Sequence, residues 1–278
     1  NIKVKKLIVL HDFMFKYYFG GSGSFNSKEI ELQNLYLNKW VKSSEIILTS
    51  NYMKSEFLKF YPKIKKKHTH IVPVAPLTQF KTMNTNSNIK KFKIKSKFIL
   101  CPTVDKPHKN IFNLIKAFNL VKKKFKNLSL VFCGAGTNLI NGNFISNGVQ
   151  ISKNRRDIYG LGYVSDDELK KLIMNAELTI NPSIYDAGNG SGLDAWQLGS
   201  PVLMSNIPPF KEQLKFHKVD AITFDPHNYF DISKKIIFLL KLSKNKKKYM
   251  VEISKKNLSK YNWKSVVDKY YKLINNLE

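Results

Sequence analysis

Two acidic residues and three glycines stand close together beyond the middle of the chain. Asp186 and Asp194 are separated by seven residues, and three glycines fall between them: Gly188, Gly190 and Gly192. The preceding segment 177–183 has the composition of a buried strand, so the glycine-rich segment is predicted to be a loop at the carboxyl end of that strand. In open parallel α/β sheets, this edge is where ligands bind.

The loop is expected to lead directly into a helix. Ser191 and Asp194 have the spacing of a capping box, which predicts a short helix over 192–198 that Gly199 ends. Free backbone N–H groups at a helix start suit a phosphate, and the glycines allow it to approach the backbone. The alternative is a plain connection in which Asp194 is only the capping acid and Asp186 a turn former. The number of glycines favours the binding loop.

A second group of polar side chains follows an earlier strand, at the start of another helix. Lys106, His108 and Lys109 lie between the strand-like run KFILC and the helix-like run NIFNLIKAF. Cations oppose the dipole at a helix N-terminus, so their presence is consistent with a diphosphate between them and the helix. The alternative is a set of solvated lysines in a lysine-rich protein.

Two further patterns are less specific. Gly134 and Gly136 follow a strand, but Leu139 stands where a dinucleotide-binding fingerprint needs Gly or Ala, which favours a tight turn from strand to helix. His11 follows the first strand, and a structural role fits its position as well as a functional one.

The composition is that of a globular protein with an excess of lysine. Of 278 residues, 43% are hydrophobic, and the formal net charge is +27. Only two basic residues are arginines, Arg155 and Arg156, and this shortage argues against sequence-specific recognition of nucleic acid. A lysine-rich surface resting on an anionic membrane is compatible with the charge. Non-specific nucleic-acid binding, which rests on charge alone, is the weaker alternative.

Cysteine use and hydropathy indicate a cytoplasmic protein. Cys101 and Cys133 each end an apolar run, and without a CxxC pattern or a Cys/His cluster they predict two buried thiols. No run approaches the ~20 apolar residues of a membrane span, and no secretory signal is recognisable. The chain begins with Asn1, so we do not expect it to be a complete translation product.

Strand-like runs alternate with segments whose apolar residues recur every three or four positions, which predicts parallel α/β sheets. Residues 97–255 contain enough elements for a complete doubly wound domain, whereas residues 1–80 contain about half of one, three strands and two helices. The polar segment 81–96 is predicted to link them. Residues 256–278 predict an amphipathic helix that packs back toward the first domain. We expect the remainder of that domain to precede this chain or to come from a second chain.

The segment INPSIYDAGNGSGLDAWQLGSPVLMSNIPPFKEQL, residues 180–214, resembles the donor-site signature of retaining glycosyltransferases of the GT-B fold, the family 4 type (glycosyl transferases group 1). That signature has Pro-Ser, an aromatic residue, an acid, a glycine-rich loop, a second acid after seven residues, and a Gly-Thr-Pro-Val-Val turn. The runs TSNYMKSEFLKFYP, HKNIFNLIKAF and LGYVSDDELKKLIMNAE resemble family segments in the same order. The resemblance covers nearly the whole chain from His11 onward. It implies a complete C-terminal Rossmann-like domain and a partial N-terminal one.

The resemblance also implies a donor site for a UDP- or GDP-sugar. Lys109 and Lys106 would hold the diphosphate, with Lys106 in place of the family's usual arginine. Asp186 would accept hydrogen bonds from the transferred sugar, and Asp194 from the ribose. His11 would face the transferred sugar from the first domain. The other implied donor contacts are Gly162, Val164, Gly188, Asn189, Gly190, Ser191 and Gly192.

The implied reaction moves a sugar to a glycan or lipid-linked acceptor with retention of configuration, with Asp186, His11 and Lys109 in catalytic roles. No metal or other cofactor is expected, because the lysines can neutralise the leaving diphosphate. The implied location is the cytoplasm, at the inner membrane face. Two departures from the family leave an alternative open: both acids are Asp rather than Glu, and a lysine replaces the arginine. That alternative is a degenerate subunit that binds a nucleotide sugar or a partner and transfers nothing.

Overall fold

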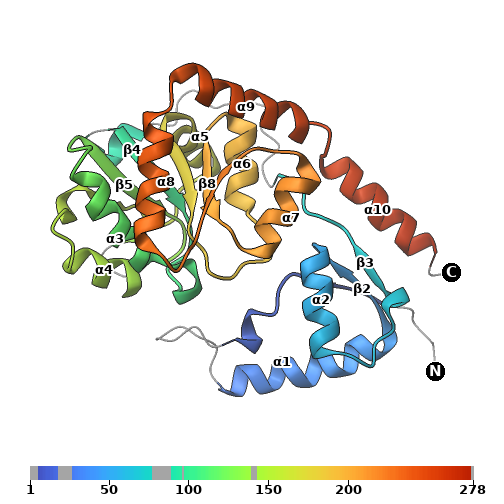
Figure 1. Cartoon of the computed structure of the whole chain (residues 1–278). Helices are drawn as coiled ribbons and strands as arrows, with labels where there is room; N and C mark the ends of the chain where they lie inside the picture. The colour runs from blue at the N-terminus through green and yellow to red at the C-terminus, as the bar shows by residue number, and fades with distance from the viewer. Residues whose placement is uncertain (1–5, 18–26, 77–88, 96, 139–142, 277–278) are drawn as a thin grey trace.

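The computed structural model describes residues 6–17, 27–76, 89–95, 97–138 and 143–276. These residues form two parallel sheets, a small one of three strands and a larger one of six, and helices pack against each sheet (Figure 1). The predicted parallel α/β class is therefore confirmed.

The small sheet has the strand order β1-β2-β3, with β1 at Lys6–Leu10, β2 at Ser44–Leu48 and β3 at Thr69–Ile71. The helices α1 (Ser27–Trp40) and α2 (Asn51–Phe60) connect these strands, together with the 3₁₀ turns η1 (Met14–Lys16), η2 (Val41–Ser43) and η3 (Lys66–His68). Helix α2 is capped by Ser50, whose side chain accepts a hydrogen bond from Met53 N at 3.1 Å. The three strands and two helices predicted for the first 80 residues are all present.

The larger sheet has the strand order β6-β5-β4-β7-β8-β9. Its strands are β4 (Lys97–Pro102), β5 (Leu128–Cys133), β6 (Ile158–Gly160), β7 (Leu178–Asn181), β8 (Val202–Ser205) and β9 (Ile222–Phe224). Numbered from its own first strand, the order is 3-2-1-4-5-6, which is that of a complete doubly wound domain. The order reverses between β4 and β7, so the loops after these two strands lie at the switch point.

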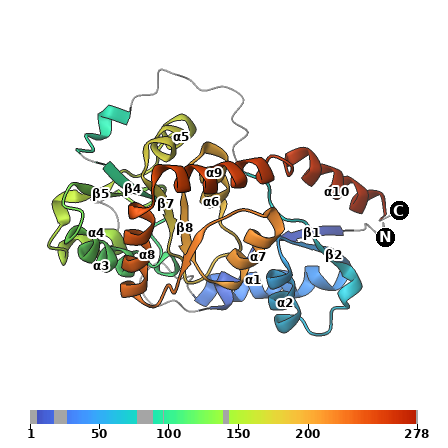
Figure 2. The ribbon, with the colours of Figure 1, turned by 45° about the horizontal axis from the view of Figure 1, so that its top comes forward.

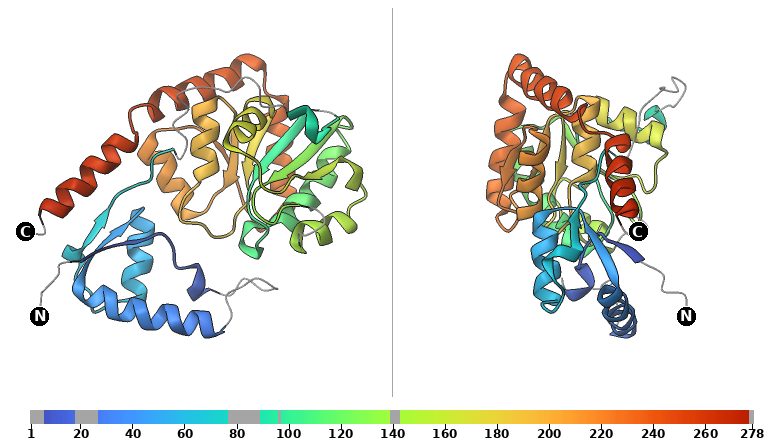
Figure 3. Two further views of the ribbon diagram at one scale, coloured as in Figure 1. Left: turned by 180° about the vertical axis from the view of Figure 1, so that it is seen from behind. Right: turned by 90° about the vertical axis from the view of Figure 1, so that its right-hand side faces the viewer.

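Helices cover both faces of the larger sheet (Figure 3). The helices on one face are α3 (Ile111–Lys122), α4 (Asn143–Gln150) and α8 (Tyr229–Lys241). Those on the other face are α5 (Asp166–Asn175), α6 (Gly190–Leu198), α7 (Pro208–His217) and α9 (Lys244–Leu258). Because successive strand residues point to opposite faces, strands β4, β5, β6 and β8 each contribute to two hydrophobic cores, one on either face of the sheet.

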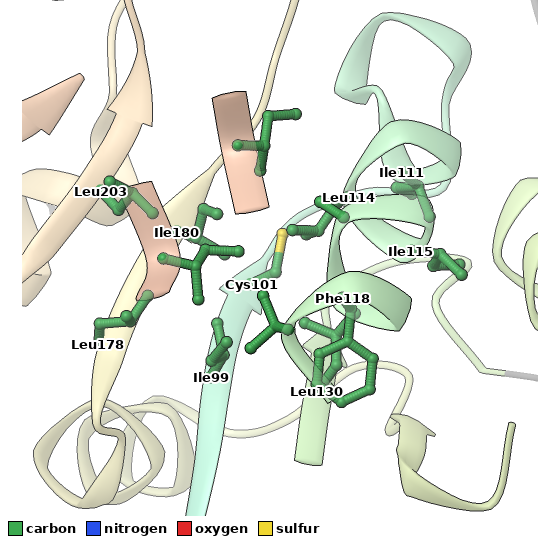
Figure 4. Close-up of a cluster of buried hydrophobic side chains, with 14 of the residues drawn as sticks. Ile99, Cys101, Ile111, Leu114, Ile115, Phe118, Leu130, Leu178, Ile180 and Leu203 are labelled. Atoms are coloured by element: carbon green, nitrogen blue, oxygen red, sulfur yellow. The ribbon is translucent and has the colours of Figure 1, made fainter. Parts of the chain in front are cut away.

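Strand β4 illustrates this division of the core. Ile99 and Cys101 belong to the cluster on the face covered by α3 and α8, part of which Figure 4 shows, whereas Phe98 and Leu100 belong to the cluster on the opposite face. Cys101 and Cys133 are buried free thiols, as predicted, and they lie in different clusters.

The C-terminal helix α10 (Trp263–Asn275) leaves the larger sheet and lies along the small one (Figure 2). Val266 packs against the small sheet, and Trp263 Nε1 donates a hydrogen bond to Pro76 O at 2.7 Å. The predicted boundary at residue 255 falls within α9. In the predicted linker 81–96, residues 89–92 form the 3₁₀ turn η4, and residues 81–88 and 96 lie outside the described part of the chain.

Three features of the helices differ from the sequence pattern. The apolar spacing over 229–247 predicts one helix, but the structure has two, because Leu242 leaves the helical conformation and the Ser243 side chain caps α9 by accepting from Lys246 N at 3.3 Å. Helix α7 begins at Pro208, and neither α7 nor α4 was predicted. In the described segments, no helix is long and apolar enough to cross a membrane.

Candidate functional site

Loops from both sheets surround a cleft of about 570 Å³ at the carboxyl edge of the larger sheet. Strand β4 pairs with β5 on one side and β7 on the other, so the loops that follow these three strands are neighbours. The loop after β1 contributes to the opposite wall. The lining residues are Asp12, Met14, Val104, Asp105, Lys106, His108, Lys109, Ala135, Gly136, Tyr185 and Asp186.

An ion pair joins two sides of the cleft. Lys109 Nζ lies 2.6 Å from Asp186 Oδ2, and both side chains are less than one-fifth exposed, at 18% and 19%. Asp186 Oδ2 also accepts from Ser183 Oγ at 3.3 Å, and Asp186 Oδ1 accepts from Ala187 N at 3.0 Å. These contacts fix the ammonium and the carboxylate in one geometry on the cleft wall.

The loop after β4 is held against the loop after β7 by hydrogen bonds to the backbone. Its 3₁₀ turn η5 (Pro107–Lys109) ends at Asn110, which has the left-handed φ of 58°. The side chain of Asn110 donates to Pro182 O at 3.0 Å and to Pro226 O at 2.7 Å. Ile184 N donates to His108 O at 2.9 Å. Because this last contact joins the two loops through their backbones, Lys109 and Asp186 are placed side by side.

Three cationic or potentially cationic side chains follow β4, as the sequence indicates. Lys106 is exposed and lines the cleft beside Lys109. His108 is only 6% exposed, and burial, with a further contribution from Lys109, lowers its pKa to about 4. His108 is therefore neutral at neutral pH, and the two lysines supply the positive charge that an anionic ligand would meet.

The glycine-rich loop is organised by Asn189 rather than by Ser191. Asn189 is the N-cap of α6, and its Oδ1 accepts from Gly192 N at 2.9 Å and from Asn181 Nδ2 at 3.0 Å. The predicted capping box of Ser191 and Asp194 is therefore wrong. The helix starts two residues earlier than expected, at Gly190, because an asparagine side chain caps as well as a serine. Gly199 ends the helix in a left-handed conformation, as predicted.

The structure brings together Lys106, Lys109 and Asp186 in the wall of the cleft, and none of the other predicted donor contacts is among the lining residues. Asp194 is buried in α6, at 4% exposure, and Gly188 lines a second cavity. The remaining residues lie at these positions: His11 is exposed after β1, Gly162 and Val164 are buried after β6, Asn189 and Gly192 are buried, and Gly190 and Ser191 are half-buried. From the described loop after β1, the cleft is lined by Asp12 and Met14 rather than by His11.

The sequence analysis assigned no role to Tyr185, and it assigned the glycines after β5 only a tight turn from strand to helix. Tyr185 OH accepts a hydrogen bond from Phe13 N at 3.0 Å, which links the two sides of the cleft, and burial raises its pKa. A Cβ on Gly134 would lie 2.0 Å from Thr103 O, so this glycine allows the loops after β4 and β5 to approach. The interruption of an apolar strand by Gly-Ala-Gly is the signal that could have indicated a close approach.

Comparison with solved structures defines the class of fold. HepE of Anabaena, solved in complex with UDP and glucose, superposes with a TM-score of 0.75 at 12% identity, over 97% of this chain and 71% of that one. A glycosyltransferase from Rickettsia africae superposes with a TM-score of 0.71 at 17% identity, over 98% of this chain and 70% of that one. The two Rossmann-like sheets thus form a GT-B-like glycosyltransferase fold, which confirms the predicted fold.

Sequence comparison identifies the family. Residues 83–257 match the family of glycosyl transferases group 1, and the chain belongs to this family. An uncharacterized glycosyltransferase of Methanocaldococcus jannaschii is 31% identical over 113 residues. That alignment covers 40% of this chain and 28% of the relative, so the chain matches well under two-thirds of the relative's length.

Proposed function

We propose that this protein transfers a sugar from a UDP- or GDP-sugar to a hydroxyl group of a glycan or lipid-linked acceptor, with retention of configuration. The observation that carries the proposal is the Lys109–Asp186 pair in the cleft, with Lys106 beside it. Two cations and one hydroxyl-binding carboxylate are the groups that a sugar diphosphate requires. Family membership supports glycosyl transfer as the reaction.

The donor would lie with its diphosphate against Lys106 and Lys109. Asp186, already held by Ser183 and Ala187, would accept hydrogen bonds from hydroxyls of the transferred sugar. The glycine-rich loop 188–192 would meet the diphosphate and sugar through its backbone, supported by Gly162 and Val164. Asp194 would accept from the ribose, and His11 would face the sugar from the small sheet.

In the proposed reaction, the bond between the anomeric carbon and the diphosphate oxygen breaks while the acceptor oxygen bonds to the same carbon. The acceptor proton passes to an oxygen of the departing diphosphate. Lys106 and Lys109 stabilise the charge that develops on this leaving group, and their fixed positions require little reorganisation during the reaction. We place this reaction in the cytoplasm, with the lysine-rich surface against an anionic membrane.

Calorimetric titration with UDP-glucose and GDP-mannose tests the donor site. We expect at least one UDP-sugar or GDP-sugar to bind, either one of these two compounds or one with a different sugar. Lys109→Gln should weaken binding about 10- to 100-fold, since it removes a charge-assisted hydrogen bond. Lys248→Gln is the matched control, because Lys248 is 74% exposed on α9, and it should bind like the unaltered protein.

The outcomes separate the proposal from its alternatives. Failure of every UDP- and GDP-sugar to bind would contradict the donor site. Normal binding without hydrolysis or transfer would instead support the degenerate subunit. Salt-sensitive binding to random oligonucleotides, with no response to nucleotide sugars, would favour the nucleic-acid alternative.

A further inference from the structure

Tyr185 lies in the loop after β7 of the larger sheet, but its ring packs in the hydrophobic core of the small sheet. The side chain is 8% exposed, its ring centre lies 5.1 Å from that of Tyr17, and its hydroxyl accepts from Phe13 N at 3.0 Å. The other buried members of this cluster all lie between residues 10 and 61. The buried aromatic residues of the cluster are Phe13, Phe15, Phe57, Tyr61 and Tyr185. The loop after β7 thus inserts a buried aromatic side chain into the core of the other sheet.

The next residue, Asp186, has its side chain in the cleft. Its carboxylate lies 2.6 Å from the ammonium of Lys109, which follows β4 of the larger sheet. The segment 182–189 forms neither helix nor strand, so no regular backbone pattern fixes Asp186. Consecutive Cα atoms are about 3.8 Å apart. The backbone of Asp186 therefore cannot move independently of Tyr185, whose side chain is anchored in the small sheet.

The hydrogen bond of Tyr185 also joins the two walls of the cleft. Phe13, whose backbone N–H donates this bond, stands between Asp12 and Met14, and both of these line the cleft from the small sheet. Tyr185 and Asp186 line it from the larger sheet. The bond thus relates the position of Asp186 to the opposite wall.

The second half of the same loop borders a different space. Ala187 and Gly188 line a smaller cavity of about 240 Å³, to which the small sheet, α7 and α10 also contribute residues. Because each half of the loop borders a cavity, neighbouring atoms confine the loop incompletely, and segments with few packing contacts open most easily. The anchor at Tyr185 therefore has a large share in holding Asp186 in place.

We propose that Tyr185 is a positioning residue for Asp186. By anchoring the neighbouring residue in the core of the small sheet, Tyr185 keeps the carboxylate at a fixed place beside Lys109 and opposite the loop after β1. The carboxylate is then correctly placed for the hydroxyls of the transferred sugar only while the two sheets stay in contact. This inference concerns Asp186 of the proposed donor site and so rests on the proposed function.

Tyr185→Phe tests this role, because it keeps the ring and removes only the hydroxyl that accepts from Phe13 N. The first measurement is hydrogen exchange by NMR on the full chain without ligand. The amide of Ala187 donates to Asp186 Oδ1 at 3.0 Å, so its exchange reports how firmly the carboxylate is held. We expect this exchange to accelerate about three- to tenfold, the effect of one hydrogen bond. The amide of Ile184, which donates to His108 O, should keep its rate.

Tyr61→Phe is the matched control. Tyr61 belongs to the same cluster and is 7% exposed, but among the described residues its buried hydroxyl has no hydrogen-bond partner. This variant should leave the exchange of Ala187 unchanged. Unchanged exchange in Tyr185→Phe would overturn the proposal, because a role in packing alone needs only the ring. Equal acceleration in both variants would also overturn it, because the cluster rather than the bond to Phe13 would then hold the loop.

Calorimetry on the same variants separates this inference from the proposed function. Asp186 would meet the sugar and the lysines the diphosphate. Tyr185→Phe should therefore weaken the binding of UDP-glucose or GDP-mannose about three- to tenfold, and that of UDP or GDP less than about twofold. Equal weakening of the nucleotide sugar and the free nucleotide would overturn the positioning role. Failure of all four compounds to bind the unaltered protein would contradict the donor site, and the exchange of Ala187 would still decide whether Tyr185 positions Asp186.

Discussion

Two histidines of this protein are buried and neutral. Burial lowers the pKa of both His108 and His217 to about 4, from an ordinary 6.5. His108 lies in the cleft wall between two lysines, whereas His217 lies at the smaller cavity. In both places protonation would put a positive charge into a poorly solvated environment.

These histidines should make the protein sensitive to mild acid. The folded pKa lies below the unfolded value, so the unfolded chain takes up protons first as the pH falls. The stability is therefore present above pH 6.5 and is lost between pH 6.5 and about 4. Urea unfolding at pH 7.5 and 5.0 should show that His108→Leu reduces this loss by roughly 2 kcal/mol. His227→Gln, at an exposed position, is the control, and an equal reduction there would contradict the explanation.

The residues of the cleft differ in how far their placement could be predicted. Lys109 and Asp186 each follow an apolar strand, and the carboxyl ends of parallel strands lie at the same edge of a sheet. Their proximity could therefore be predicted from the sequence. The pairing of β4 with β7 confirms that argument. The lining of the smaller cavity was not predictable, because it combines residues of the small sheet, α7 and α10, which are far apart in the sequence.

Among the elements, α6 shows how one side chain fixes a loop. Asn189 is fully buried, and its amide oxygen accepts from Gly192 N, Asn181 Nδ2 and Ser191 Oγ. A Cβ on Gly192 would lie 2.4 Å from Asn189 Nδ2, so the glycine is required for this packing. The rigidity of the glycine-rich loop thus depends on the cap and on a residue without a side chain.

Asn189→Ala should therefore destabilise the protein far more than Ser191→Ala. The first change removes the cap, worth about 1 kcal/mol, and leaves the buried Asn181 amide without its acceptor, worth about 1–3 kcal/mol. The second change removes a hydroxyl that donates to the cap, and should cost less than about 0.5 kcal/mol. Urea denaturation of the two variants provides the measurement. Equal losses would mean that the serine shares the capping role.

Strands were easier to predict than helices in this chain. The nine strands of the described segments all lie in short apolar or β-branched runs of the sequence, because a doubly covered parallel sheet needs continuous apolar segments. Helix α7 begins with two prolines. A pair of prolines in a sequence indicates a loop, although proline also suits the first turn of a helix. The division between α8 and α9 rests on the Ser243 cap, a single side chain within a lysine-rich run.

At the scale of the molecule, a small number of side chains holds the two sheets together. Tyr185 OH accepts from Phe13 N, Tyr261 OH donates to Pro73 O at 2.6 Å, and Glu212 of α7 accepts from the first two amides of α2. The carboxylate of Glu212 also lies favourably at the positive end of the α2 dipole. Pro73 and Glu212 line the smaller cavity at this junction, whereas Tyr185 lines the larger cleft.

Glu212→Ala should loosen this junction without unfolding either sheet. The amides of Asn51 and Tyr52 lose a charged acceptor, and charge-assisted hydrogen bonds are worth about 1.5–3 kcal/mol, so their hydrogen exchange should accelerate roughly 10- to 100-fold. Ser50 continues to cap Met53 N, so exchange later in α2 should change little. Glu252→Ala is the control, because Glu252 is 63% exposed on α9, where it lies 3.7 Å from Lys248. Unchanged exchange at Asn51 and Tyr52 would show that Glu212 does not hold the junction, whereas faster exchange throughout α2 would mean that the small sheet depends on the larger one to fold.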